Sequence, residues 1–292
     1  MNYHFIRLVL GSMLFGFCLN TFASPVPQQV QVQLSPGTTV SQGGLLLVTV
    51  SSAEPLPKGA KAKFLGKSMP LFWQADRQYS TVFGVNADQV AKVYSLEIVS
   101  PEGAALVSPQ SVTVKAKSFG TQNIAVSKST GGLQPIPGEL EAVEKLKQVL
   151  TPVKHWTLGQ FVSPTIDCEN SPFGVRRYHN GKYTGNYHKG VDLRSPLHRA
   201  IRATAGGVVQ IATQKFRLHG GTVGIDHGQG LSSIYIHMSK VLVSPGELVK
   251  TGQVIGEVGS TGFATGPHLH WGLYASGQPV DPNLLVPFSM CK

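Results

Sequence analysis

Residues 266–271 read Gly-Pro-His-Leu-His-Trp, and the two histidines of this stretch, His268 and His270, stand two positions apart. Because the side chains of a β-strand alternate between its two faces, both imidazoles point the same way, about 6–7 Å apart along the strand. This spacing suits one metal ligand and one neighbour directed at a water on the metal. A chance pair of surface histidines is the alternative, so the assignment depends on the rest of the chain.

A second pattern lies upstream, where residues 188–192 read His-Lys-Gly-Val-Asp. On a helix, His188 and Asp192 would share one face, but Gly190 and the apolar residues on either side of Asp192 favour a loop that enters a strand. In that geometry the loop can fold His188 back beside the carboxylate. The pattern is weak when taken alone.

A third histidine, His237, lies near the end of the apolar run of residues 234–238. A buried histidine with one hydrogen bond is the ordinary interpretation of such a position. The three patterns together, however, place two histidines, one carboxylate and two further histidines in one part of the chain. Catalytic zinc sites take three protein ligands from His and Asp/Glu and leave a fourth position for a water whose pKa the metal lowers. The patterns fit this design.

The residues around these patterns resemble those of the lysostaphin-type (LytM-like) zinc metallopeptidases, which cleave peptide cross-links in bacterial peptidoglycan. The matching segments, in chain order, are residues 173–176 (Phe-Gly-Val-Arg), 188–192, 235–238 (Tyr-Ile-His-Met), 249–256 and 259–271. The resemblance implies that one zinc ion is bound by His188, Asp192 and His270. It also implies that His237 and His268 are catalytic, flanking the water and the scissile carbonyl, and that a β-sheet forms the floor of a groove walled by loops.

Some members of this family have lost metal ligands and activate other wall hydrolases. This chain keeps all five positions, so we expect a secreted zinc metalloendopeptidase that hydrolyses amide bonds in peptidoglycan stem peptides or cross-bridges. The alternative is a non-catalytic peptidoglycan-binding regulator. D-Ala to diaminopimelate cross-links are the expected substrate, with a glycine bridge as the other option. A linker or N-terminal domain lying in the groove would make the enzyme latent.

The fold is expected to be mainly β, with an immunoglobulin-like β-sandwich in residues 24–118. Strict period-2 alternation runs through residues 30–34, and residues 45–50, 94–99 and 112–114 are further predicted strands between Gly/Pro/Ser turn clusters. Several strands at spacings of about ten residues favour a sandwich. This part carries no constellation of catalytic groups, which makes a spacer or a substrate-positioning module the expected role.

Residues 119–152 are predicted to be a linker that contains one short helix. Ser, Thr, Gly and Pro dominate residues 118–138, and apolar residues then recur at helical spacing from Glu139 to Leu150, with acidic residues in the first turn. We expect the apolar stripe of this helix to pack between the two domains. The β-sheet peptidase domain is predicted to cover residues 153–292.

Charge and composition exclude a typical nucleic-acid binder. The 292 residues carry a formal net charge of +10, yet only 14% are charged and the longest basic run is the pair Arg176 and Arg177. Residues 151–292 hold 13 basic and 7 acidic residues, so most of the excess falls in the histidine-bearing part. A weakly basic groove rim would suit the carboxylates of stem peptides.

Residues 1–23 have the features of a secretory signal peptide. Arg7 precedes an apolar run that is shorter than the ~20 residues of a membrane-spanning helix, and Ala23 offers a cleavage position. We therefore expect export to the periplasm or the cell envelope, no transmembrane helix in the mature chain and a monomer; an uncleaved anchor is the alternative. Cleavage removes Cys18 and leaves Cys168 and Cys291, for which one disulfide or two separate thiols are the options.

Overall fold

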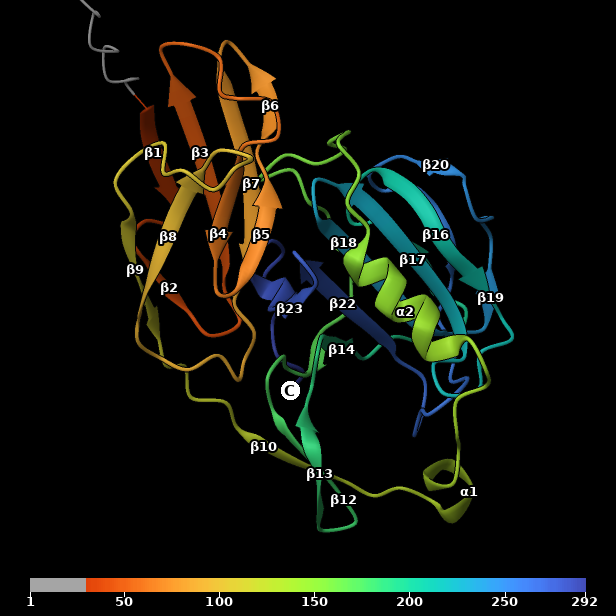
Figure 1. The fold of residues 1–292 in the computed structure, drawn as a ribbon. Helices are drawn as coiled ribbons and strands as arrows, with labels where there is room; N and C mark the ends of the chain where they lie inside the picture. Colours follow the sequence, from red (N-terminus) through yellow and green to blue (C-terminus); the bar gives the residue numbers. More distant parts are fainter. Residues whose placement is uncertain (1–29) are drawn as a thin grey trace, which may run out of the picture.

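The computed structural model describes residues 30–292 and confirms a mainly β protein (Figure 1). The predicted signal peptide and Cys18 lie outside the described residues. Within residues 30–292, no helix combines the length and apolar character that crossing a membrane requires.

The N-terminal half contains two β-sheets that share one core. One sheet has the order β1 (Val30–Ser35), β3 (Leu45–Ser52), β7 (Gln78–Gly84), β6 (Phe72–Ala75). The other has the order β2 (Thr39–Ser41), β9 (Gln110–Lys115), β8 (Val93–Val99), β4 (Lys61–Phe64), β5 (Lys67–Pro70). Alternate residues of β3, namely Leu46, Val48 and Val50, are buried in this core.

The C-terminal half is built on one large sheet with the order β11 (Glu169–Ser171), β14 (Val191–Leu193), β22 (Leu269–Ala275), β18 (Leu231–Met238), β17 (Gly221–Gly228), β16 (Gly207–Thr213), β20 (Leu248–Val249). β23 (Gln278–Val280) pairs with β22, and Pro282–Leu284 form a 3₁₀ turn. A smaller sheet of β15 (Ala200–Arg202), β21 (Val254–Glu257) and β19 (Lys240–Val241) lies beside it. The main core fills one face of the large sheet with residues such as Val191, Tyr235 and Trp271.

The two halves meet through apolar side chains. Leu45 and Leu47, on the face of β3 that points away from its own core, pack in one cluster with Leu273 and Val280. Gly84 allows this close approach, because a Cβ at this position would stand 2.7 Å from the backbone oxygen of Ala275. The first half of β3 is therefore apolar on both faces, and its outward leucines are partly buried at this junction.

The predicted linker contains more regular structure than expected. β10 (Thr121–Ile124) pairs in parallel with β12 (Arg176–His179), which pairs with β13 (Lys182–Tyr187). The prediction of a single helix was wrong, because two α-helices occur in the described residues: α1 (Lys128–Gly131) and α2 (Glu139–Gln148). The short α1 has no apolar periodicity, and its N-terminus is capped by the Ser127 side chain.

The position predicted for the main helix was also wrong. Val143 and Leu146 of α2 are buried against Ile234, Ile236 and neighbouring residues of the large sheet. Figure 1 shows α2 lying across β17 and β18. The helix thus covers the open face of the C-terminal sheet, because that face presents the apolar side chains that match its stripe. It ends at Gln148, two residues before the predicted end, since Val149 leaves the helical conformation (ψ 132°).

Candidate metal centre

Strand pairing brings together the residues that the sequence patterns singled out. β14 and β22 run antiparallel, with Asp192 directly opposite His270. On the other side of β22, His270 stands opposite Ile236, the residue before His237. Directly opposed residues have Cβ atoms about 5 Å apart, so the sheet register places Asp192 beside His270. His237 would face the other way in a regular strand, but its φ of 65° departs from strand geometry. His188 comes from the loop just before β14.

Three donor atoms converge at this point. The distances are 3.0 Å from His188 Nε2 to Asp192 Oδ1, 2.9 Å from Asp192 Oδ1 to His270 Nδ1, and 2.9 Å between the two imidazole nitrogens. Ligands held about 2.1 Å from one tetrahedral zinc ion lie about 3.4 Å from each other. The triangle therefore fits a zinc ion after shifts of a few tenths of an ångström, and its nitrogen and carboxylate donors are those that zinc takes in catalytic sites.

Hydrogen bonds orient these donors. His188 Nδ1 donates to the carbonyl oxygen of Pro172 at 3.0 Å, which leaves the Nε2 lone pair directed at the centre. Histidines that bind metals usually make such a bond through the other ring nitrogen. Burial alone would raise the pKa of Asp192, but His188 and His270, through their charge and hydrogen bonds, hold it well below its usual range. The carboxylate is therefore ionised and available as a ligand.

A polar network supports the carboxylate and was missed by sequence reasoning. Arg177 Nη2 donates to Asp192 Oδ2 at 2.9 Å and to Ser171 Oγ at 3.0 Å. Ser171 Oγ in turn donates to Gln122 Oε1 at 2.7 Å. Arg177 belongs to the basic pair noted in the sequence, but nothing in the sequence indicated which strand it would face. Gln122 lies on β10, within the predicted linker.

The other two predicted histidines lie beside the triangle. His237 Nδ1 donates to the carbonyl oxygen of Thr261 at 2.8 Å, and His268 Nδ1 donates to that of Gly266 at 2.9 Å. Their ring centroids are 4.8 Å apart, and His268 Nε2 stands 3.9 Å from Asp192 Oδ1. Burial, followed by the nearby charges of His268 and His270, lowers the pKa of His237 to about 3. His237 is therefore neutral at pH 7, with a free lone pair on Nε2.

The five residues line a cavity of about 920 Å³. The sheet of β10, β12 and β13 lines part of the cavity, together with the loop that carries Phe263, and α2 lines another part. The lining residues that come from the predicted linker include Gln122, Ile124, Leu140, Glu144 and Lys147. The centre thus lies in a groove of mixed polar and apolar lining.

Two further histidines, His227 and His219, make hydrogen bonds to residues outside the triangle. His227 is fully buried between the carbonyl oxygen of Gly206 (2.6 Å) and Ser233 Oγ (2.8 Å), and burial lowers its pKa to about 4. His219 Nδ1 donates to Glu139 Oε1 at 2.7 Å.

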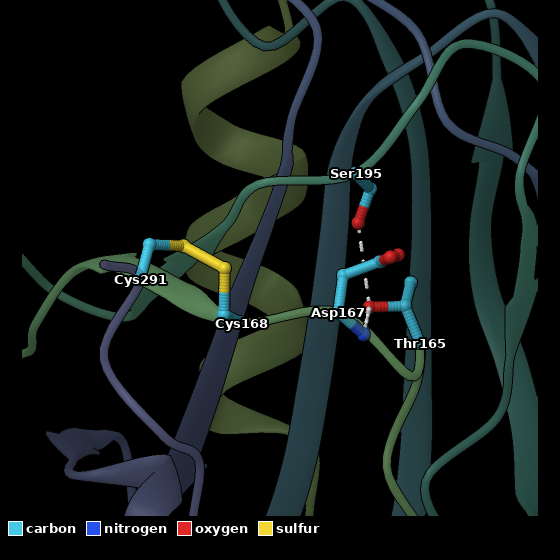
Figure 2. The surroundings of a disulfide bond; sticks show 5 residues. All are labelled: Thr165, Asp167, Cys168, Ser195 and Cys291. Atoms are coloured by element: carbon cyan, nitrogen blue, oxygen red, sulfur yellow. Dashed lines mark hydrogen bonds between the residues drawn. A yellow bond between two sulfur atoms is a disulfide. The ribbon is translucent and has the colours of Figure 1, made fainter.

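The predicted disulfide is confirmed, with Cys168 bonded to Cys291 across a sequence separation of 123 residues. Figure 2 shows the bond at the end of the chain segment that carries Thr165 and Asp167. Cys168 directly precedes β11, whose last residue, Ser171, belongs to the polar network behind the metal centre. The bond therefore attaches the C-terminal tail to the strand that supports this centre.

Comparisons with known proteins agree with this geometry. Residues 186–282, which contain all five site residues, match the model of peptidase family M23. Over 113 residues the chain is 42% identical to the DD-carboxypeptidase/endopeptidase Mpg of Neisseria meningitidis, covering 39% of this chain and 26% of Mpg. Over 112 residues it is 38% identical to the peptidoglycan DD-endopeptidase ShyA of Vibrio cholerae, covering 38% of this chain and 26% of ShyA. The chain thus matches about a quarter of the length of these curated relatives.

A solved structure from Pseudomonas aeruginosa, assigned to peptidase M23, superposes with a TM-score of 0.63 at 25% identity. The match covers 85% of this chain and 95% of that one, so it extends well beyond the segment that the family model matches. The resemblance seen in the sequence motifs is confirmed. Residues 186–282 form a peptidase M23 domain.

Proposed function

We propose that this protein is a zinc-dependent endopeptidase that hydrolyses amide bonds in peptidoglycan, with D-Ala to diaminopimelate cross-links as the substrate. The observation that carries the proposal is the triangle of His188 Nε2, Asp192 Oδ1 and His270 Nδ1, with sides of 2.9–3.0 Å, on the floor of a groove. The named DD-endopeptidase activities of its relatives support the choice of bond.

In this proposal His188, Asp192 and His270 hold one zinc ion per chain. Zinc in such a site supplies an acidified water and polarises a carbonyl oxygen. Two histidines of the chain would then accept a proton and stabilise the developing negative charge. His237, kept neutral by burial, accepts a proton through Nε2, while its Nδ1–H bond to Thr261 fixes the ring. His268, on the same face of the groove, is placed to stabilise negative charge that develops on the scissile carbonyl oxygen.

The proposal also assigns roles to the segments of the chain outside the candidate metal centre. Residues 1–23 would direct export to the periplasm or cell envelope, and the mature chain would act as a monomer. We propose that residues 24–118 form an immunoglobulin-like module, that residues 119–152 connect the parts, and that residues 153–292 form the peptidase domain. The apolar junction between the halves supports a role in positioning substrate over that of a flexible spacer.

Two variants test the site. Asp192→Ala is expected to lose both zinc and activity, because it removes one ligand and leaves two histidines. His237→Ala is expected to retain zinc and lose turnover. His198→Ala is the matched control, since the side chain of His198 is 69% exposed and pairs with Glu257, outside the groove. The measurements are zinc content by elemental analysis and the release of new amino groups from purified sacculi.

The same experiment tests the alternative function. A non-catalytic regulator would bind sacculi without releasing amines, whether or not zinc is present. Full activity of either Asp192→Ala or His237→Ala would contradict the assignment of the site.

A further inference from the structure

Helix α2 lies outside the segment that matches the family model, yet it forms part of the groove wall. Its residues Leu140, Val143, Glu144 and Lys147 line the cavity. These positions are spaced as i, i+3, i+4 and i+7, so one face of the helix points at the groove. The groove of this protein thus has a wall that the peptidase segment alone does not provide.

Lys147 places a positively charged side chain in that wall. Its side chain is only 13% exposed, and its ammonium group lies 5.3 Å from the ring centroid of Tyr274, a buried residue of the groove floor. Its one ion-pair partner in the described part of the chain is Glu144, at 2.5 Å, whose side chain is 59% exposed. Ion pairs with so exposed a partner contribute little free energy. A ligand carboxylate can therefore replace Glu144 at low cost.

A second cation faces the same cavity. Lys189 lies next to His188 and lines the groove, and it makes no ion pair with any residue of 30–292. Both lysines line the same cavity, Lys147 from α2 and Lys189 from the loop just before β14. Two cations that line one groove make it a favourable place for an anion.

We propose that Lys147 and Lys189 form a carboxylate-binding subsite, which takes the free carboxylate of a stem peptide whose neighbouring amide bond lies over the metal centre. The inference rests on the proposed function, because it names how the substrate of that same site is recognised. It assigns substrate selection to a residue of the predicted linker, Lys147, and predicts discrimination between stem peptides with a free carboxylate and those in which the carboxylate is amidated.

The test compares Lys147→Met with Lys145→Met in the full chain loaded with zinc. Both lysines lie on α2 and methionine keeps the helix and the contact with Tyr274, but Lys145 is exposed and does not line the groove. The substrates are two defined cross-linked dimers that differ only in a free carboxylate or a carboxamide next to the scissile bond. The corresponding uncleaved monomer peptides serve as probes of equilibrium binding.

Lys147→Met is expected to raise KM for the carboxylate dimer about tenfold, because it removes one charge-assisted hydrogen bond to the substrate at a partly exposed site. KM for the amidated dimer and the zinc content should not change, and Lys145→Met should match the wild type on both dimers. An equal effect of Lys147→Met on the two dimers would overturn the subsite.

The binding measurement separates this proposal from the proposed function. A wild type that cleaves neither dimer, yet binds the carboxylate monomer about tenfold more tightly than the amidated one, would overturn the proposed function and retain the subsite. Equal affinity of the wild type for the two monomers would overturn the subsite, whatever the activity.

Discussion

Replacing Glu139 by glutamine is expected to lower the free energy of unfolding by about 3 kcal/mol at pH 7. Glu139 begins α2 and its side chain has no exposed surface. Its Oε1 accepts from the backbone N–H groups of Leu218 (2.9 Å) and His219 (2.8 Å) and from His219 Nδ1. Its Oε2 accepts from the backbone N–H groups of Ile136 (3.0 Å) and Arg217 (2.9 Å). One carboxylate thus fastens the helix to the loop before β17.

The magnitude follows from the pKa of this carboxyl group. Burial would raise the pKa, but the hydrogen bonds from His219, Ile136 and Arg217 outweigh it and lower the pKa of Glu139 from 4.5 to about 2. At about 1.4 kcal/mol for each pH unit, this difference corresponds to about 3 kcal/mol. Because the folded-state pKa is depressed, the contribution is fully present above pH 4.5 and is lost as the pH falls toward 2.

The assay is urea unfolding followed by circular dichroism, in the presence of a chelator, at pH 7, 5 and 3. Glu141→Gln is the matched control, because Glu141 lies in the same first helical turn but is exposed; it should change stability by less than about 0.5 kcal/mol. The difference between wild type and Glu139→Gln should shrink to less than half of its pH 7 value at pH 3. A difference below about 1 kcal/mol at pH 7, or one that does not depend on pH, would refute the reasoning.

Two other predictions concern the supports of the metal centre. Replacing Cys168 and Cys291 together by serine should lower the free energy of unfolding by up to about 5 kcal/mol, since the bond closes a loop of 123 residues; unfolding of the wild type with and without reductant provides the comparison, and equal midpoints would contradict it. Arg177→Met should weaken zinc binding about 10- to 100-fold in a chelator competition, because it removes the donor to Asp192 Oδ2. Arg176→Met, which instead removes a contact with Asp88, should leave zinc affinity unchanged, and equal losses in the two variants would count against the role of Arg177.

The sequence patterns singled out the residues of the candidate metal centre more fully than their surroundings. The alternation of a strand explains why His268 and His270 share a face, and the family resemblance implied that His188, Asp192 and His270 bind one zinc ion. Local patterns of this kind predict which side chains lie together, because the residues concerned are close along the chain or directly opposite in one sheet.

The parts that sequence reasoning missed depend on contacts between distant segments. Arg177 and Gln122 reach the centre because β10 pairs with β12, and a parallel pairing between a linker strand and a domain strand leaves no local signal. The apolar stripe of α2 was recognised, but a stripe does not identify its partner, which turned out to be β17 and its neighbours. Residues 45–50 were predicted as a strand, but nothing in the pattern indicated that the outward side chains of Leu45 and Leu47 lie at the junction of the two halves.

The structure also locates the basic side chains more closely than the charge counts of each sequence segment did. Most of the excess lies in residues 151–292, but Lys147 of α2, in the predicted linker, also lines the groove. Whether a weakly basic rim binds stem-peptide carboxylates stays a prediction, and the Lys147 and Lys145 variants address it.

The central claim is that the triangle of His188, Asp192 and His270 holds a zinc ion that serves amide hydrolysis in peptidoglycan. The most direct measurement is mass spectrometry of a defined muropeptide dimer with a D-Ala to diaminopimelate cross-link, after incubation with zinc-loaded wild type or Asp192→Ala. The account predicts that the wild type converts the dimer into two monomers whose masses sum to that of the dimer plus one water, and that Asp192→Ala leaves it intact. An intact dimer after incubation with wild type that carries one zinc ion per chain would contradict the account.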